Sequence, residues 1–170
     1  AKPKDQQQLG ALQTQAYLAY ILSLENRLQG EEMKKWFASL YEQRGELNNY
    51  GRALLALALH NDKQADNARI VLRNILQFVE RDDSNDTAWV RTPENYWWYW
   101  WNNDIEVNAW ALKALVTLEP QNELAPRLVK WLLNNRRNGH YWRSTRDTAL
   151  VIAAMTDFMR ASGESVPDYT

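Results

Sequence analysis

Four short segments of nearly continuous apolar residues recur along the chain, and each begins with alanine. These segments are Ala16–Leu22, Ala53–Leu59, Ala109–Leu115 and Ala149–Met155. Their apolar residues are not confined to one stripe, and a helix that is apolar on all sides is buried on all sides. The frequent alanines let neighbouring helices approach closely. The pattern therefore predicts four buried helices.

Amphipathic segments lie between the apolar ones. Their apolar residues recur at spacings of three and four, as expected for helices with one buried face. They fall within Met33–Tyr41, Ile70–Val79 and Leu124–Leu132. Buried and half-buried helices thus alternate, and the apolar segments recur after roughly 40 residues, which suits one helical hairpin per repeat. The middle interval is longer by roughly 19 residues, which indicates an insertion.

This alternation is typical of two all-α architectures, a closed α/α ring and an open α-solenoid. We favour the ring because the inner helices are uniformly apolar, whereas the inner row of a solenoid faces a solvated concave surface. The usual closed ring has six hairpins, and this chain supplies about four. We therefore predict a partial α/α toroid over residues 1–163, followed by a linker to a further domain at residues 164–170.

Helix boundaries are marked by several end signals. Gly30 ends one helix and acidic residues open the next, while Pro120 closes the third apolar helix and Pro126 fits a first helical turn. Ser144 and Asp147 have the spacing of a capping box, in which Ser144 accepts from a first-turn amide and Asp147 reaches back to the cap. We expect a helix to begin directly after Ser144.

The insertion contains the strand signals of the sequence. Thr87–Arg91 and Tyr96–Trp100 are rich in aromatic and β-branched residues and flank a turn at Thr92–Asn95. This arrangement predicts a small aromatic β-hairpin. Alternate residues of a strand lie on opposite faces, and both faces of the second strand are aromatic.

One aromatic face of the second strand is the candidate binding surface of the chain. It is formed by Tyr96, Trp98 and Trp100. Its flat rings could stack on a sugar, belong to the core, or dock against a neighbouring domain. The density of the cluster and its two aromatic faces favour core and interdomain contact over ligand binding.

Composition narrows the classes of function. The chain has 20 basic and 21 acidic residues, a balance that argues against the basic surface of a nucleic-acid-binding protein. It has no cysteine, which excludes disulfides, thiolate zinc sites and cysteine nucleophiles within it. Its longest apolar run is too short to span a bilayer. Its start lacks an initiator Met and a signal peptide, so we expect a piece of a longer chain.

Few residues carry a signal for catalysis. Asp82–Asp86 matches the DDxxD pattern that holds magnesium and diphosphate in prenyl-transfer enzymes, a chemistry that needs carboxylates on consecutive turns of one helix. Here the run stands where a helix ends before the hairpin, and we interpret it as a solvated helix terminus. His60 closes an apolar helix and His140 lies in a turn, and neither has a nearby Ser or Cys. We predict no catalytic residue, no metal site and no cofactor.

Two motifs, in this order, resemble the thioester domain of the alpha-2-macroglobulin family. Asn103–Leu112 resembles that domain's aromatic hairpin leading into an Asn/Glu-Val/Ile-Glu helix, and Asn138–Leu150 resembles its Gly-containing turn and Ser-Thr-x-Asp-Thr helix start. The closing Phe158–Glu164 is similar to the exit from this domain in bacterial members. The likeness covers most of residues 6–164.

The resemblance implies an α/α toroid within a very large protease-trapping protein. In this family a bait region is cut, the molecule collapses around the protease, and a Cys–Gln thioester can tether it. Bacterial members are typically periplasmic and often lipid-anchored. We therefore expect a non-enzymatic fragment of a broad-spectrum protease inhibitor, periplasmic or extracellular. Its expected partners are other domains of the same chain and, through the parent protein, target proteases, with no nucleic acid and no direct membrane insertion.

The sequence departs from the family pattern at the thioester. The motif Cys-x-Glu-Gln is absent, and no His precedes His60, although members with an activating His place it near what would be this N-terminus. Either the chain omits the first third of the ring, or the parent belongs to the bacterial branch without a thioester. The resemblance implies that Tyr96, Trp98 and Trp100 dock against another domain or shield the thioester environment from water.

A different class of function stays open from the ring architecture alone. Terpenoid cyclases and some polysaccharide-processing enzymes also use an α/α ring, so an enzyme of either type is the alternative. The paired carboxylates of a glycosidase are not identifiable by spacing in this chain.

Overall fold

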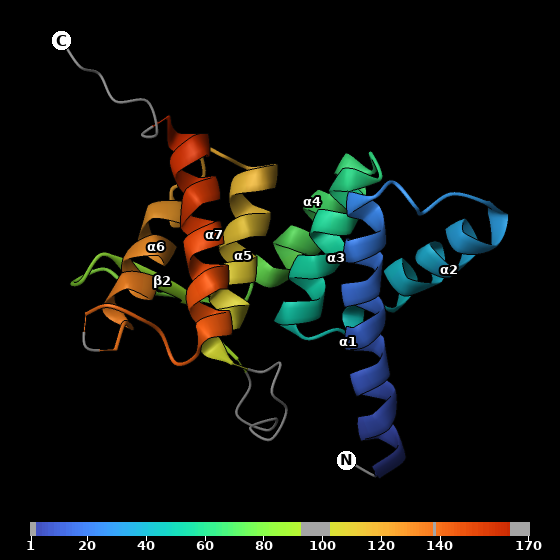
Figure 1. Cartoon of the computed structure of the whole chain (residues 1–170), viewed down its shortest axis with the longest axis horizontal. Coiled ribbons are helices and arrows are strands. Elements are labelled where there is room, and N and C mark those ends of the chain that lie inside the picture. The colour runs from blue at the N-terminus through green and yellow to red at the C-terminus, as the bar shows by residue number, and fades with distance from the viewer. Residues whose placement is uncertain (1–2, 93–102, 138, 164–170) are drawn as a thin grey trace. The chain divides into compact units, whose positions relative to one another are not determined.

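The computed structural model describes residues 3–92, 103–137 and 139–163 of the chain (Figure 1). The chain divides into two compact units, residues 1–75 and 76–170. Within the described residues it is mostly helical with one two-stranded sheet, so the prediction of an all-α fold with a small β insertion is confirmed.

The described residues of the first unit form helices and their connections, whereas the second unit combines a β-hairpin with helices. The first contains α1 (Pro3–Leu24), α2 (Glu31–Glu42), the short 3₁₀ helix η1 (Gln43–Gly45), α3 (Asn49–Asn61) and α4 (Ala65–Leu76), whose last residue lies past the boundary. The second contains β1 (Val79–Asp82), β2 (Thr87–Val90), α5 (Asp104–Leu118), α6 (Leu124–Asn134) and α7 (Thr145–Ser162).

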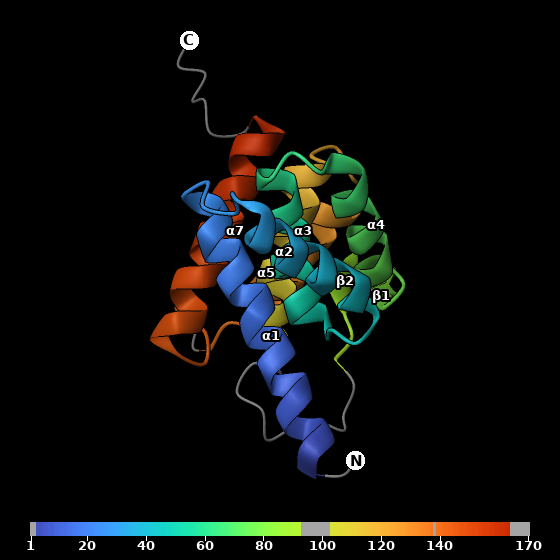
Figure 2. The same cartoon turned by 90° about the vertical axis from the view of Figure 1, so that its right-hand side faces the viewer.

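Helix α3 is the core of the first unit. Its residues from Asn49 to Leu59 are buried, with the single exception of Arg52. Helix α1 runs alongside it (Figures 1 and 2). Two side-chain hydrogen bonds hold α1 in place: Asn61 Nδ2 donates to Ser23 Oγ at 3.0 Å, and Trp36 Nε1 of α2 donates to Gln15 Oε1 at 3.2 Å.

Gly51 permits the close approach of α1 and α3. A Cβ atom at this position would lie 2.2 Å from Gln13 Oε1 and 2.9 Å from Leu47 Cδ2. The start of α3 is fixed by its N-cap, because Asn48 Oδ1 accepts from the Gly51 amide at 2.9 Å. A side chain at this position would require Gln13 and Leu47 to shift.

Helix α5 is the core of the second unit. Nearly all of its residues from Glu106 to Val116 are buried, and α7 packs along it (Figure 1). Helix α6 packs mainly against β2, where Trp89 and Trp131 stack with ring centroids 6.5 Å apart. Lys113 of α5 pairs with Asp157 of α7, which links the two helices farther along their length.

The β-hairpin differs from the predicted one. The strands are antiparallel, and Val79 pairs with Val90 while Asp82 pairs with Thr87. The predicted strand at Thr87–Arg91 is confirmed over Thr87–Val90, but its proposed partner at Tyr96–Trp100 lies outside the described residues. The prediction of a helix as far as Val79 is wrong, because α4 ends at Leu76 and the chain enters β1.

The predicted helix ends are largely confirmed. Helix α2 begins at Glu31, as expected, but the prediction that Gly30 ends a helix is wrong, because α1 already ends at Leu24. Pro126 lies in the first turn of α6, and α5 ends at Leu118, before Pro120. Helix α7 begins directly after Ser144, as expected.

The four apolar segments are not buried alike. In α3 and α5 the prediction is confirmed, with Leu57 5% and Ala111 3% exposed. In α1 and α7 it is wrong for one face of each helix, since Leu18 is 48% and Ile152 is 54% exposed. The reason is that α1 packs mainly against α3, and α7 mainly against α5, which leaves the opposite faces without a covering element in their own unit.

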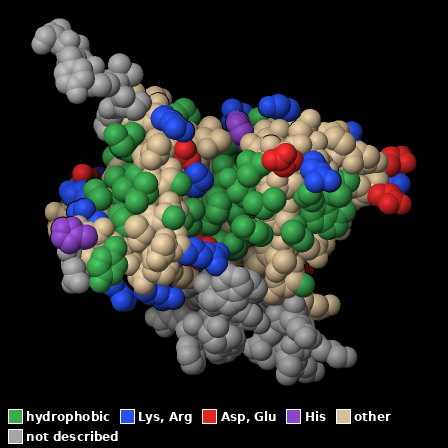
Figure 3. Space-filling model, in the orientation of Figure 1, with side chains coloured by type: hydrophobic (Ala, Val, Ile, Leu, Met, Phe, Trp, Pro, Cys, Tyr) green, Lys and Arg blue, Asp and Glu red, His purple; other side chains and the backbone are tan. Residues whose placement is uncertain are grey.

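The exposed face of α1 adjoins a groove shared with α2. The groove has a volume of about 320 Å³, and Figure 3 shows hydrophobic side chains gathered over these two helices on the right of the view. It is lined by Leu18, Ile21, Leu22, Glu32, Met33 and Trp36.

Candidate functional site

The two motifs that carry the family resemblance meet in the second unit, at the N-termini of α5 and α7. Asn103 is the N-cap of α5, and its Oδ1 atom accepts from the Ile105 amide at 3.1 Å. Its Nδ2 atom donates to Asp147 Oδ1 of α7 at 2.8 Å. A single side chain thus begins one helix and holds the start of the other. We call this group, with Glu106 and Arg146, the α5–α7 polar cluster.

Ser144 caps α7 as the sequence predicts. The Asp147 amide donates to Ser144 Oγ at 3.0 Å. The second half of the predicted capping box is wrong, because the Asp147 carboxylate accepts from Asn103 instead of reaching back to the cap. Asp147 is only 2% exposed, and within the described residues its Oδ2 atom has no hydrogen-bond partner. The long-range contact replaces the local one because the two helix starts lie side by side.

Glu106 and Arg146 form the charged part of the cluster. Arg146 Nη2 lies 2.5 Å from Glu106 Oε1, and Glu106 is 2% exposed. Burial raises the pKa of Glu106 above its ordinary value, and the nearby Asp147 charge adds to the rise. The Arg146 guanidinium opposes that rise in pKa, because its positive charge and its hydrogen bond stabilise the Glu106 carboxylate. The pair therefore fastens the first turn of α5 to the first turn of α7.

Asn108 joins α5 to the hairpin. Its Oδ1 atom accepts from the Val90 amide at 2.7 Å, and its Nδ2 atom donates to the Val90 carbonyl at 3.2 Å and to the Asp104 carbonyl at 2.9 Å. Asn108 is fully buried, so these bonds satisfy polar groups that would otherwise be desolvated without partners. Sequence analysis missed this role, although a buried polar residue within an apolar helix is a signal for it.

The α5–α7 polar cluster positions the first turns of two helices. Its carboxylates are buried and engaged with Asn103 and Arg146, and its members include no thiol or imidazole. Across the described residues, no group of three or more His, Asp or Glu side chains is arranged to hold a metal ion. The cluster fixes the N-termini of α5 and α7 relative to each other, and Asn108 joins α5 to β2.

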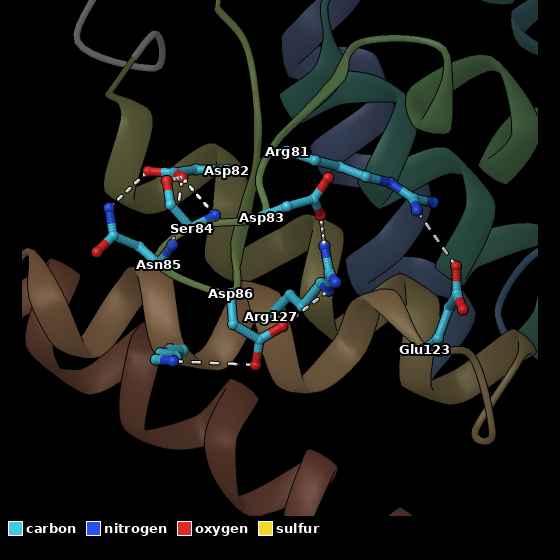
Figure 4. Close-up of polar contacts among 9 residues, drawn as sticks. Arg81, Asp82, Asp83, Ser84, Asn85, Asp86, Glu123 and Arg127 are labelled. Carbon is cyan, nitrogen blue, oxygen red and sulfur yellow. Dashed lines mark hydrogen bonds and ion pairs between the residues drawn. The ribbon is translucent and has the colours of Figure 1, made fainter.

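The Asp82–Asp86 run forms the turn between β1 and β2, not a helix terminus, so that interpretation is wrong (Figure 4). Asp82 accepts from Ser84 and Asn85, and these hydrogen bonds lower the pKa of Asp82 to about 2. Turn chemistry of this kind explains why the chain reverses here.

The remaining acids of the turn face a cation on α6. Arg127 lies 2.6 Å from Asp83 Oδ1 and 3.1 Å from Asp86 Oδ1, and Lys130 lies 3.9 Å from Asp86 Oδ2. Figure 4 shows Asp82 directed towards Ser84 and Asn85, away from Arg127. The carboxylates do not converge on one point, which removes the geometric basis for a magnesium–diphosphate site.

The other predicted residues have separate places. His60 lies in the last turn of α3, and His140 is an exposed turn residue beside Gly139, as the sequence indicated. Tyr96, Trp98 and Trp100, the candidate docking or shielding surface, lie outside the described residues. Their role stays a prediction.

A comparison with protein-family models gives a match over most of this chain. A protein-family model described as the A-macroglobulin TED domain matches residues 11–158. The match contains both the α5 and the α7 motif, and it covers well over half of the 170 residues. A search of curated proteins found no matching relative.

Proposed function

Because the chain belongs to the A-macroglobulin TED domain family, we propose that it is a structural module of a bacterial protease-trapping protein. This domain is a non-enzymatic module of protease inhibitors, and it belongs to larger alpha-2-macroglobulin chains that bind proteases. The observation that carries the proposal is the family match, together with a motif cluster that positions two helices.

In this proposal the chain is a fragment, with residues 1–163 forming part of an α/α toroid and residues 164–170 a linker. The apolar faces of α1 and α7 support it. Tyr17, Leu18 and Ile21 on α1 and Ile152 and Met159 on α7 are all at least 40% exposed. Terminal repeats of a stacked array carry a polar outer face, so an apolar outer face is typical of a repeat that a neighbouring repeat covers. We expect further helical hairpins of the parent protein to cover both faces.

The proposed location is periplasmic or extracellular, where a protease trap meets its targets. Members of the family are extracellular or secreted. None of the helices in the described ranges is long and apolar enough to cross a membrane.

The test uses the parent protein that contains this sequence. Incubation with an excess of protease should cut the parent, change its mobility on a native gel, and protect large protein substrates from the trapped protease. The 170-residue chain alone should not inhibit the same protease, because trapping needs the bait region and the surrounding domains. A parent that is cut without retaining the protease would overturn the proposal.

The predicted aromatic surface can be tested in the same parent. Trp98→Ala should speed spontaneous loss of the thioester if the parent has one, because water would reach the acyl carbon. If the parent has none, the change should loosen domain docking, measured by limited proteolysis, while the helical content persists. Unaltered thioester lifetime and unaltered trapping would assign the aromatic residues to the core.

The alternative, an α/α-ring enzyme, has a direct test. Magnesium-dependent turnover of a prenyl diphosphate by the 170-residue chain, lost in Asp82→Asn with Asp86→Asn, would support it. We expect no turnover, because these two carboxylates face different partners in the turn.

A further inference from the structure

The connection between α6 and α7 is unusually basic. From Asn135 to Ser144 the chain contains three arginines and no Asp or Glu, although its overall formal charge is -1. Arg136, Arg137 and Arg143 lie in or beside the connecting turn and are exposed. We call these three residues the arginine turn. Figure 3 shows Lys and Arg side chains gathered near a histidine at the left of the view, over this connection.

The arginine turn differs from the other basic residues of its unit. Arg81, Arg91, Lys113, Arg127, Lys130 and Arg146 each make an ion pair. In the described part of the unit, Arg136, Arg137 and Arg143 make none, and Arg160 near the end of α7 is the other such residue. The unit pairs most of its cations internally and leaves three together on one turn. Such a local excess of positive charge attracts an anionic partner.

Hydrogen bonds join the described residues on the two sides of the turn. The Arg137 amide donates to the Tyr141 carbonyl at 2.6 Å, the His140 amide donates to the Arg137 carbonyl at 3.1 Å, and Gly139 has a φ of 75°. Trp142 is buried, and its Nε1 atom donates to the Leu132 carbonyl of α6 at 2.8 Å. The turn is therefore anchored at its base, and less backbone order has to be gained when a partner binds.

We propose that the arginine turn is a docking surface for an acidic segment of a partner polypeptide. The planar guanidinium group matches a carboxylate with two parallel hydrogen bonds, which favours Asp and Glu side chains as the ligands. Tyr141, which is 46% exposed, forms a backbone bridge with Arg137, and Arg and Tyr are enriched in protein interfaces. This surface is separate from the α5–α7 polar cluster and from protease trapping as such.

Two other anionic partners fit the surface less well. A membrane surface is favoured by apolar side chains that insert beside the cations, and the tryptophan of this turn is buried in the unit. A nucleic acid needs cations that follow its phosphates over several nucleotides, whereas these arginines occupy a single turn. A short acidic stretch of polypeptide matches both the size and the chemistry of the turn.

The experiment measures fluorescence anisotropy of a fluorescein-labelled oligoglutamate peptide titrated with the 170-residue chain. We expect saturable binding at low ionic strength that weakens as salt is raised. Changing Arg137→Glu with Arg143→Glu should weaken binding about tenfold or more, because two attractive ion pairs become repulsive. The neutral double variant Arg137→Gln with Arg143→Gln should weaken it less.

A matched control distinguishes this surface from the charge of the whole chain. Lys34→Glu with Lys35→Glu makes the same charge change at exposed positions of α2 and should leave peptide binding within about twofold, because any loss reflects only general charge. Circular dichroism checks that each variant keeps its helices. Equal loss in the two Glu variants, or absence of binding by the unaltered chain, would overturn the proposal. So would tighter arginine-dependent binding of oligothymidylate or of vesicles containing phosphatidylserine.

Discussion

Helices α3 and α1 have the same all-round apolar pattern in sequence, yet they differ in burial. Helix α3 is buried at nearly every position from Asn49 to Leu59, whereas α1 exposes Tyr17, Leu18 and Ile21. The second unit repeats the contrast, with α5 buried and α7 exposing Ile152. An all-round apolar pattern thus shows that a helix can be buried on all sides. How much of the helix is buried depends on the number of elements that pack against it. Exposed apolar faces of this kind are candidates for contact with further protein.

The largest expected change in the free energy of unfolding concerns α3, the buried helix of this comparison. Leu57→Asp should lower the free energy of unfolding by about 4 kcal/mol, because an unpaired charge enters an apolar layer. Leu18→Asp, the matched change on the exposed face of α1, should alter it by less than about 0.5 kcal/mol. Urea unfolding of the 170-residue chain, followed by circular dichroism, measures both. Equal effects of the two changes would mean that the difference in burial has no energetic counterpart.

A smaller effect is expected where α3 meets α1. Gly51→Ala should lower the free energy of unfolding by about 1–3 kcal/mol, because the new methyl group overlaps Gln13 and Leu47 and both must shift. Gly45→Ala is the control, since nothing lies within 4 Å of its added Cβ atom. The same urea experiment applies. A Gly51→Ala variant as stable as the control would show that α1 can move away from α3 without loss.

Buried and exposed carboxylates can be compared in the same way, and Glu106 is the buried one. The pKa of Glu106 is raised by burial, so the folded protein holds a proton more readily than the unfolded chain. Its contribution to stability is present below the unfolded pKa, near 4.5, and is lost as pH rises through the raised folded pKa. Relative to Glu106→Gln, the unaltered chain should therefore lose stability between acidic and neutral pH. Urea unfolding over a pH series measures this difference, and a constant difference would contradict it.

Asp82 is the exposed counterpart, and its effect should be the smallest and opposite in direction. Hydrogen bonds from Ser84 and Asn85 lower its pKa to about 2. Its contribution is present above the unfolded pKa, near 3.8, and is lost as pH falls through about 2. An NMR titration of the Asp82 carboxyl should show this low midpoint, which Ser84→Ala should raise. A midpoint near 3.8 in the unaltered chain would contradict the turn geometry.

Much of the helical fold follows from local pattern. Residue spacing predicts helices around α2, α3, α5 and α6, and end signals place the starts of α2 and α7. The burial of α1 and α7 could not be predicted in the same way, because apolar content does not say how many neighbours a helix has. The end of α4 was also misplaced, since Val79 continues a helical spacing while being an equally good strand residue.

In the candidate site too, local contacts could be predicted from the sequence and long-range contacts could not. The Ser144 cap depends on residues three apart and could be predicted, whereas the bond from Asn103 to Asp147 joins residues 44 positions apart. The short acidic run at Asp82 has the composition of a metal motif, but the identity of its neighbours, Ser84 and Asn85, determines a turn. Local hydrogen bonds therefore determine that these carboxylates form a turn and not a metal-binding motif.

The amide side chain of Asn108 has a consequence for self-association. A strand edge with unpaired main-chain groups is a template on which a strand from another molecule can add, and such growth leads to aggregation. At Val90 both main-chain groups on that side of β2 are already bonded to Asn108. The side chain imitates the donor and acceptor of one more strand residue and closes this position to intermolecular β-pairing. A polar residue inside an apolar helix thereby occupies the main-chain groups of one position on the edge of the small sheet.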